Sequence, residues 1–485
     1  MTYLVKGDKN DWEVVLGLEV HAQINTKSKL FSTAANNFGA DPNSQVSLVD
    51  AGMPGALPVI NKECVKQAIL TGIGLNAKIN LISIFDRKNY FYPDLPQGYQ
   101  ISQFTHPIVG KGYIFIDTDN GKKKIGITRL HLEQDAGKSL HVENTDYSLI
   151  DLNRSGCGLM EIVSEPDLRS PIEAAQYVKK LRSILRYIGS CDGNMERGNL
   201  RADVNVSVRQ KDSKLGTRCE IKNVNSIKFI QQAIEHEAKR QVKIIESGKT
   251  LKQETRLFDP QKGETRSMRS KEESHDYRYF PDPDLPPLRI EEKLVEQLKK
   301  EMPELPDMKK QRFISDYAIK EYDATILVSE REIADFFEEL IPNRDTKLVI
   351  SWLTGELFSY LKKKNIGIKD KNISVDKMGE LIDLIQNGTL SNRLAKELFE
   401  EYIEGNKSAK ELVNEKGMIQ ISDENVINKM IDEVLESNPK MLDDFRNGKE
   451  KLFGFFVGQI MKVSNGKANP QMVNTFLKKK LNQDG

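Results

Sequence analysis

The first part of the chain contains several segments in which apolar and polar side chains alternate. The clearest runs from Val14 to Ile24, where the even positions are apolar and the odd positions from 17 onward are Gly17, Glu19, His21 and Gln23. Successive side chains of a β-strand point to opposite faces. The pattern therefore predicts a strand that buries one face and presents Glu19 and His21 together on the other.

Four further segments alternate in the same way, at residues 129–133, 160–164, 201–209 and 218–224. Their polar positions carry carboxylates, histidine, arginine and amides, namely Arg129, His131, Glu133, Glu161, Arg201, Asp203, Asn205, Glu220 and Lys222. A half-exposed antiparallel sheet alternates anyway, with its polar face simply in water. Because solvated faces usually carry Lys, Thr and Ser, the composition of these segments favours a functional polar face on one shared sheet.

Two amphipathic helices are predicted between these strands. Ser170 followed by Pro171 is typical of a helix N-terminus, and the apolar residues after it recur at helical spacing up to Ile188. Ser226 precedes a similar run, and Gly248 is a plausible stop. Both helices are expected to lie against the sheet.

The pattern of apolar positions changes at four prolines, Pro281, Pro283, Pro286 and Pro287. Alternating segments come before them and helical spacing follows them, because neither a helix nor a central strand tolerates such a run of prolines well. A second, softer break is a polar stretch at residues 404–408. We therefore predict an α+β protein with three parts. These are a large antiparallel-sheet-rich domain at 1–292, an all-α middle domain at 293–405 and a small all-α domain at 406–485.

Composition restricts the class of protein. The chain has 485 residues, and its 72 basic against 71 acidic side chains give a net charge of +1, unlike a polycationic nucleic-acid coat. No apolar stretch approaches the roughly 18–20 residues of a membrane span, and the N-terminus resembles neither a signal nor a transit peptide. The four cysteines lie far apart without a CxxC pair. We expect a cytoplasmic protein with reduced thiols.

If the alternating strands share one sheet, several carboxylates and a histidine converge. Such carboxylates repel one another unless a cation or a shared proton lies between them. Oxygen ligands with one imidazole favour Mg²⁺ or Mn²⁺, and nearby basic residues would suit phosphate. This indicates phosphoryl chemistry and leaves open whether it is transfer from a nucleotide or phosphodiester hydrolysis.

No standard nucleotide loop or amidase segment accompanies this face. Asp135 to Ser139 (DAGKS) ends like a P-loop, but the glycine that a P-loop needs five residues before Gly137 is replaced by Leu132. A glycine- and serine-rich amidase segment is also missing from the sequence. A nucleotide would therefore bind on the sheet itself.

The C-terminal segment is basic. Between residues 446 and 480 it carries Arg446, Lys449, Lys451, Lys462, Lys467, Lys478, Lys479 and Lys480 against one acid, Glu450. A solvated basic helix face is one interpretation. The other is contact with a nucleic-acid backbone, because phosphate charge favours clustered Lys and Arg.

Several long and uncommon strings occur in order along the chain. They are GLEVHAQ (17–23), FDRKNYFYPDLPQGYQISQ (85–103), HLEQDAGKS (131–139), DLNRSG (151–156), EIVSEPD (161–167), LRADVNVSVR (200–209), EIKNVNS (220–226), DYRYFPDPDLPPL (276–288) and FGFFVGQIMKVSNGKANPQ (453–471). Together they resemble the B subunit of aspartyl/glutamyl-tRNA amidotransferase, the GatB family, and the last is also similar to YqeY-type domains. The resemblance covers essentially the whole chain.

The resemblance implies a bacterial, cytoplasmic enzyme that uses ATP and Mg²⁺. The family phosphorylates the side-chain carboxylate of misacylated Glu-tRNA(Gln) or Asp-tRNA(Asn), and ammonia then displaces the phosphate. The ammonia comes from a separate amidase chain, the A subunit, and a small C subunit completes a heterotrimer. Which of the two tRNAs is used stays open, since that depends on the synthetases of the organism.

The resemblance also implies residue roles. Glu19, His21, Glu133 and Glu161 are expected metal ligands; Asp203, Glu220 and Lys88 further catalytic residues; Arg201, Asn205 and Lys222 nucleotide contacts. Lys88 would contact a phosphate or the ammonia path, and the basic residues of the tail would contact tRNA. Two rival functions remain, a metal-dependent phosphodiesterase and a non-catalytic tRNA scaffold.

One departure from the family concerns Gln134. Many members have a second glutamate at this position, directly after the residue that matches Glu133. Because alternation points Gln134 to the other side of the strand from Glu133, we expect Glu133 to be the ligand.

Overall fold

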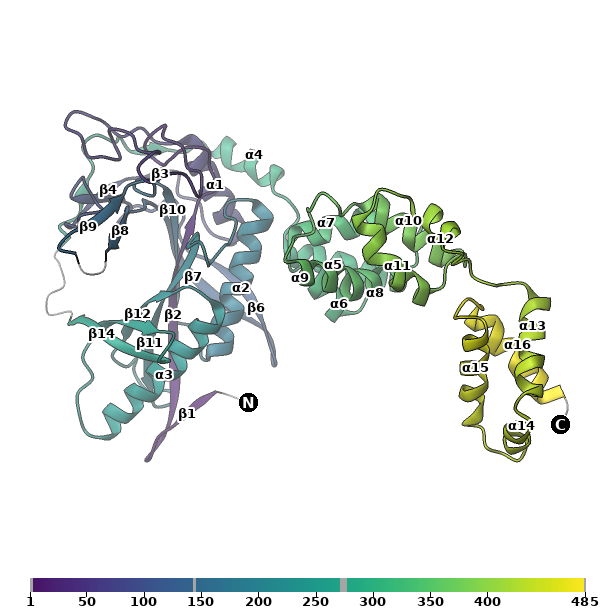
Figure 1. Cartoon of the computed structure of the whole chain (residues 1–485). Helices are drawn as coiled ribbons and strands as arrows, with labels where there is room; N and C mark the ends of the chain where they lie inside the picture. Colours follow the sequence, from purple (N-terminus) through teal and green to yellow (C-terminus); the bar gives the residue numbers. More distant parts are fainter. Residues whose placement is uncertain (1–2, 143–144, 271–276, 484–485) are drawn as a thin grey trace. The chain divides into compact units, whose positions relative to one another are not determined.

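The structure is a computed structural model that describes residues 3–142, 145–270 and 277–483 (Figure 1). The chain divides into two compact units, at 1–306 and 307–485, which are described separately. The first residue of the DYRYFPDPDLPPL string, Asp276, lies outside the described residues. In the described part, no helix combines the length and the apolar character that crossing a membrane requires.

The first unit is built on one large sheet, as the alternating segments predicted. In the described part this sheet has the strand order β14-β13-β12-β11-β2-β10-β7-β6, with β1 paired to β2. Its strands are β1 (Leu4–Lys6), β2 (Asp11–Gln23), β6 (Gly112–Thr118), β7 (Gly121–Gln134), β10 (Gly158–Ser164), β11 (Leu200–Arg209), β12 (Cys219–Val224), β13 (Glu254–Asp259) and β14 (Glu264–Ser270).

Neighbouring strands of this sheet run antiparallel, except β12 and β13, which run parallel. The exception follows from α3 (Ile227–Glu246), which connects these two strands as a crossover helix. The fold class is thus confirmed: an α+β protein whose sheet-rich first part precedes a helical region.

Helices cover one face of the sheet and leave the other to the polar side chains. The even positions of β2, from Val14 to Ala22, join a core with α1 (Lys62–Gly74), α2 (Pro171–Ile188) and α3. Both predicted helices are confirmed, and α2 and α3 lie beside each other against the sheet (Figure 1). Ser170 and Ser226 cap their N-termini by accepting from the backbone N–H groups of Glu173 and Phe229.

Shorter strands lie outside this sheet. They are β3 (Ile82–Ser83), β4 (Asp86–Asn89), β5 (Tyr99–Ser102), β8 (Lys138–His141), β9 (Ser148–Asp151), β15 (Phe280–Pro281) and β16 (Leu288–Arg289). They form the small sheets β15-β4-β5, β16-β3 and β8-β9. The unit ends with α4 (Glu292–Glu301), whose Leu298 is buried in the same core as the sheet.

The second unit is helical. Its elements are α5 (Pro306–Tyr317), α6 (Glu321–Leu327), α7 (Arg331–Leu340), α8 (Thr346–Ser351), a π-helical turn η2 (Trp352–Leu357), α9 (Phe358–Lys364), α10 (Val375–Gln386), α11 (Asn392–Glu404), α12 (Ala409–Glu415), α13 (Glu424–Glu436), α14 (Pro439–Arg446), α15 (Leu452–Val463) and α16 (Pro470–Gln483). The last four share an apolar core centred on Phe456 and Ile460. The domain limits near 292 and 405 stay predictions.

Candidate active site

The register of four neighbouring strands aligns polar side chains in a row across the sheet. His131 of β7 lies directly opposite Glu161 of β10, Glu161 opposite His21 of β2, and His21 opposite Arg201 of β11. Directly paired side chains of adjacent strands lie on the same face, about 5 Å apart. The convergence predicted from alternation therefore occurs, and it brings in His131, which was not among the predicted site residues.

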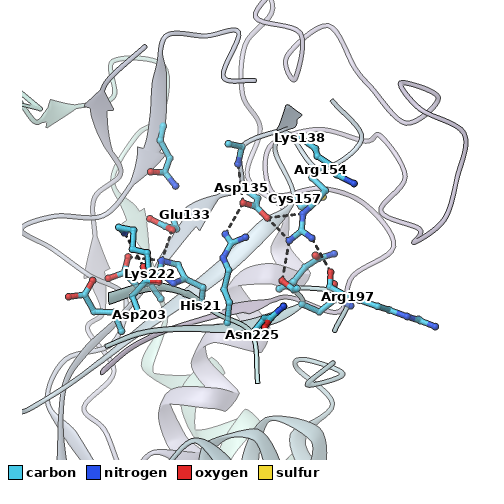
Figure 2. Close-up of a pocket in the computed structure, with 18 of the residues that line it drawn as sticks. His21, Glu133, Asp135, Lys138, Arg154, Cys157, Arg197, Asp203, Lys222 and Asn225 are labelled. Atoms are coloured by element: carbon cyan, nitrogen blue, oxygen red, sulfur yellow. Dashed lines mark hydrogen bonds and ion pairs between the residues drawn. The ribbon is translucent and has the colours of Figure 1, made fainter. Parts of the chain in front are cut away.

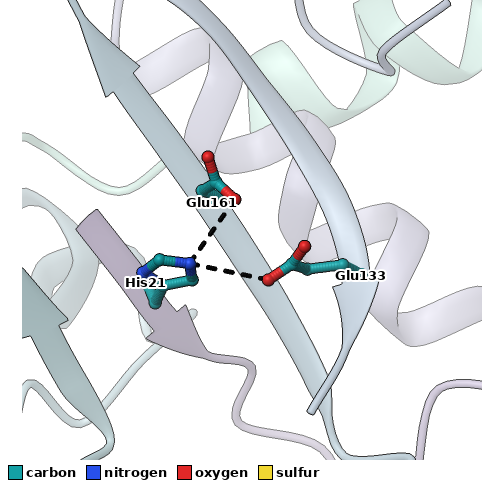
Figure 3. A group of neighbouring side chains, drawn as sticks. All are labelled: His21, Glu133 and Glu161. Atoms are coloured by element: carbon teal, nitrogen blue, oxygen red, sulfur yellow. Dashed lines mark ion pairs between the residues drawn. The ribbon is translucent and has the colours of Figure 1, made fainter. Parts of the chain in front are cut away.

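Three side chains in this row and beside it, those of His21, Glu133 and Glu161, form a group with the geometry of a cation site (Figure 3). The Nε2 atom of His21 lies 3.4 Å from Glu161 Oε2 and 3.6 Å from Glu133 Oε1. One donor atom from each of the three residues lies within 4.8 Å of the other two. The Nδ1 atom of His21 is buried and has no hydrogen-bond partner among the described residues. Two carboxylates and one imidazole at these separations fit a divalent cation such as Mg²⁺ or Mn²⁺.

The charges of this group depend strongly on one another. Burial alone would raise the pKa of Glu161, but the charge and hydrogen bonds of His131 and His21 hold it well below its usual range. Burial would lower the pKa of His131, whereas the two carboxylates raise it to about 9. The carboxylates are thus ionised, and because they are buried, their negative charge needs a positive charge nearby to be stable. A bound divalent cation would meet the same demand.

A second acidic group lies next to the first, toward β11 and β12. Glu19 Oε1 accepts a hydrogen bond of 2.9 Å from the Asn205 amide. The Lys222 ammonium lies 3.0 Å from Asp203 and 2.8 Å from Glu220. Burial and the nearby charge of Glu161 raise the pKa of Glu19. Glu19 therefore lies in a different setting from the three residues of the His21 group.

Basic side chains surround Asp135, which follows directly after β7. Asp135 accepts from Arg154 Nη2 at 2.7 Å and from Arg201 Nη2 at 2.8 Å. Burial would raise the pKa of Asp135, but these two guanidinium groups lower it. Arg197 stacks over the ring of Phe38, and Lys138 is exposed nearby (Figure 2). This end offers several N–H donors to an anion.

Both ends belong to one cavity of about 1450 Å³. The His21 group lines its carboxylate end, and Asp135 with its two arginines lines its basic end. Figure 2 labels His21 and Glu133 of the first group and Asp135 and Arg154 of the second. Lys88 enters from β4, with its ammonium 4.9 Å from the ring centre of Tyr277 and 5.8 Å from that of Tyr90. Burial would lower the pKa of Lys88, but Glu133 and the tyrosines raise it. Lys88 is thus a permanent cation beside the carboxylates.

Known families match nearly all of the chain. A model of the GatB/GatE catalytic domain matches residues 14–296, and a model of the GatB domain matches 335–481. Proteins named as the B subunit of aspartyl/glutamyl-tRNA(Asn/Gln) amidotransferase are similar over almost their full length. That of Pelagibacter ubique is 60% identical over 99% of this chain and 98% of its own, and that of Granulibacter bethesdensis 58% identical over 99% and 100%. The chain belongs to the GatB family.

The structure of this GatB chain brings the predicted residues of the sheet together. The residues predicted for catalysis, metal and nucleotide all line the one cavity: Glu19, His21, Lys88, Glu133, Glu161, Arg201, Asp203, Asn205, Glu220 and Lys222. Of the four predicted metal ligands, His21, Glu133 and Glu161 lie within ligand reach of one another. Gln134 points away as expected, and its amide donates to Gln97 at 2.7 Å.

Some cavity residues of this GatB chain were not predicted. They are Asp135, Lys138, Arg154 and Arg197. Asp135 directly follows β7, Lys138 begins the short strand β8, and the two arginines lie outside the strands, so none of the four belongs to the segments selected by alternation. The available signal was their position in the strings that carry the family resemblance: Asp135 and Lys138 lie in HLEQDAGKS, and Arg154 lies in DLNRSG. Arg197 lies outside these strings, three residues before LRADVNVSVR. Glu165 shares the odd positions of its segment but lies outside the cavity, because β10 is irregular between Val163 and Ser164.

The predicted tRNA-binding residues lie on the helices and turns of the GatB tail. Arg446, Lys449, Lys451, Lys462, Lys478 and Lys479 are exposed, whereas Lys467 and Lys480 are half-buried. Two of these lysines have acidic partners: Lys449 lies 3.0 Å from Asp444, and Lys480 pairs with Asp432. Their charge is therefore partly compensated inside the unit.

Proposed function

We propose that this chain activates the side-chain carboxylate of misacylated Glu-tRNA(Gln) or Asp-tRNA(Asn) with ATP and then amidates it. The relatives are named as amidotransferase subunits acting with these two tRNAs. The observation that carries the proposal is the two-ended cavity. The His21 group, which suits a divalent cation, and an arginine-lined end, which suits phosphates, lie in the same cavity.

The reaction has two steps. A carboxylate oxygen of the aminoacyl group attacks the γ-phosphorus of ATP and ADP leaves, which forms an acyl phosphate. Ammonia then attacks the carbonyl carbon, phosphate leaves and a proton is lost to solvent. The first step converts a poor leaving group into a good one, and both steps need compensation of phosphate charge.

The chain's own residues supply much of this compensation. We propose that His21, Glu133 and Glu161 hold a divalent cation, which would neutralise phosphate charge when bound. Arg201 and Lys222 would contact the nucleotide from β11 and β12, and Asn205 would orient Glu19 at the edge of the site. Lys88, held between tyrosines next to Glu133, would face the acyl phosphate or the entering ammonia.

The assembly is part of the same proposal. The relatives' names make them subunits of a larger enzyme, and the sequence lacks an amidase segment. A separate amidase chain, the A subunit, would release ammonia from glutamine, and a small C subunit would complete a heterotrimer in the bacterial cytoplasm. The tail would bind tRNA away from its acceptor end.

The test supplies ammonia directly. The chain, alone and with its amidase partner, receives Mg²⁺-ATP, ammonium chloride and each misacylated tRNA, and the amidated aminoacyl-tRNA and the ADP are measured. We expect amide formation that requires ATP, matched by ADP. Nucleic-acid cleavage without ATP would instead establish a phosphodiesterase, and no amide even with the partner present would establish a tRNA scaffold.

Substituting two tail lysines is expected to weaken tRNA binding without affecting chemistry. Lys478 and Lys479 are exposed on α16, so replacing both with alanine should remove up to two phosphate contacts. The slope of log K against log salt should then fall by about one unit per lost contact, measured between about 50 and 200 mM salt. The matched control removes Lys293 and Lys300, exposed on α4, and should leave the slope unchanged. Equal slopes for both double variants would contradict the tail's role.

A further inference from the structure

A second histidine touches both carboxylates of the proposed cation site, and its two ring nitrogens have different partners. We propose that His131 is a positioning residue, which holds Glu133 and Glu161 in place for a divalent cation without being a ligand itself. This inference rests on the proposed cation site. It concerns how the chain prepares that site.

The geometry places Glu161 between two imidazoles. His131 and His21 lie on the strands on either side of it, each directly opposite Glu161 in the register. Each Nε2 atom lies 3.4 Å from the same oxygen, Glu161 Oε2. His131 is only 4% exposed, so these contacts are shielded from water. Such shielding strengthens the orienting effect of each contact.

Glu133 uses its two oxygens differently. Its Oε2 atom faces His131 Nε2 at 3.6 Å and accepts from the Ser102 hydroxyl at 3.4 Å. Its Oε1 atom faces His21 Nε2 at 3.6 Å. One oxygen of Glu133 is thus occupied by supporting contacts, and the other is directed to the place where the cation would bind.

Arg129 distinguishes the two histidines. Its Nε atom lies 3.4 Å from His131 Nδ1 and so contacts the side of the ring opposite the carboxylates. The ligand atoms that lie within 4.8 Å of one another, among the described residues, include one from His21 and none from His131. An Nε2 atom that carries hydrogen donates to carboxylates and has no lone pair for a metal. The Nδ1 atom of His21 has no such partner among the described residues. His21 can therefore present a lone pair to the cation, whereas His131 holds the two carboxylates in position through its Nε2 atom.

The test measures Mn²⁺ binding to the full-length chain by calorimetry and by electron paramagnetic resonance. His131→Leu removes the donor, and we expect an affinity about 10–100-fold lower, as for other residues that orient metal ligands. His131→Gln returns an N–H donor near the Nε2 position and should restore most of the affinity. His236→Leu is the control, because His236 is half-buried under a distant part of the sheet and hydrogen-bonds with Thr265.

A spectroscopic readout separates positioning from ligation. Electron spin-echo modulation of bound Mn²⁺ should show one coordinated imidazole nitrogen, which His21→Gln removes and His131→Gln preserves. Two coordinated imidazoles in the wild type would overturn the proposal. Unchanged or tighter binding in His131→Leu would overturn it as well. If the wild type shows no Mn²⁺ binding that Glu161→Gln abolishes, the proposed cation site itself fails, which is a distinguishable result.

Discussion

Replacing Glu161 with glutamine is expected to slow ATP-dependent amide formation by about 100-fold or more. Glu161 is paired on both sides by histidines and belongs to the only group of cation-binding geometry found among the described residues. Glutamine keeps the shape of the side chain but removes its negative charge. The measurement is the rate of amidated aminoacyl-tRNA formation at saturating ATP and ammonium, together with Mn²⁺ affinity.

The control for this prediction is Glu165→Gln. Glu165 follows the same strand, accepts a hydrogen bond of 2.9 Å from Thr128 and lies outside the cavity. It should retain the wild-type rate and Mn²⁺ affinity. If Glu161→Gln keeps a near-normal rate while melting like the wild type, phosphoryl transfer does not depend on this carboxylate and the proposed cation site is wrong.

The polar face of the sheet was predictable because strand alternation is a local property. Glu19 and His21 share a face in any strand that contains both, whatever the rest of the chain does. Which residue lies opposite which was not predictable. The alignment of His131, Glu161, His21 and Arg201 depends on strand order and register, and these are set by turns and long-range packing.

The basic end of the cavity shows a second limit of pattern reasoning. Arg154 lies in a loop, so no periodicity marks it, and its contact with Asp135 joins residues 19 positions apart in the sequence. Counting charges in the tail has the same weakness. Lys480 is basic in the sequence, but Asp432 from another helix pairs with it. In contrast, the helix starts at Ser170 and Ser226 were found because capping is a short-range hydrogen bond.

Replacing Glu237 with alanine is expected to lower the free energy of unfolding by about 3–5 kcal/mol. Glu237 lies on α3 and is fully buried, with 0% exposure. Its carboxylate accepts from Arg240 at 2.8 Å, Gln241 at 2.9 Å and Thr265 at 2.9 Å, and lies 3.3 Å from Arg256. These contacts tie α3 to β13 and β14, and without Glu237 two arginines lose a buried counter-charge.

The pH dependence of this effect has a definite sign. Burial would raise the pKa of Glu237, but the hydrogen bond and charge of Arg240 lower it overall in the folded chain. A lowered folded pKa gives stability that is present above the unfolded pKa of about 4.3 and is lost as pH falls through the folded pKa. The difference between wild type and Glu237→Ala should therefore be largest near neutral pH and shrink in acid.

Urea unfolding between neutral and acid pH, with hydrogen exchange of β13 and β14 as the local readout, measures this difference. Glu235→Ala is the control, because Glu235 is exposed on the same helix and its loss should change stability by less than about 0.5 kcal/mol. A Glu237→Ala variant as stable as Glu235→Ala at neutral pH would show that Glu254 alone compensates the two arginines, which it contacts at 3.1 Å (Arg240) and 2.7 Å (Arg256). In that case the support of this edge of the sheet would come from Glu254 rather than from the buried carboxylate on α3.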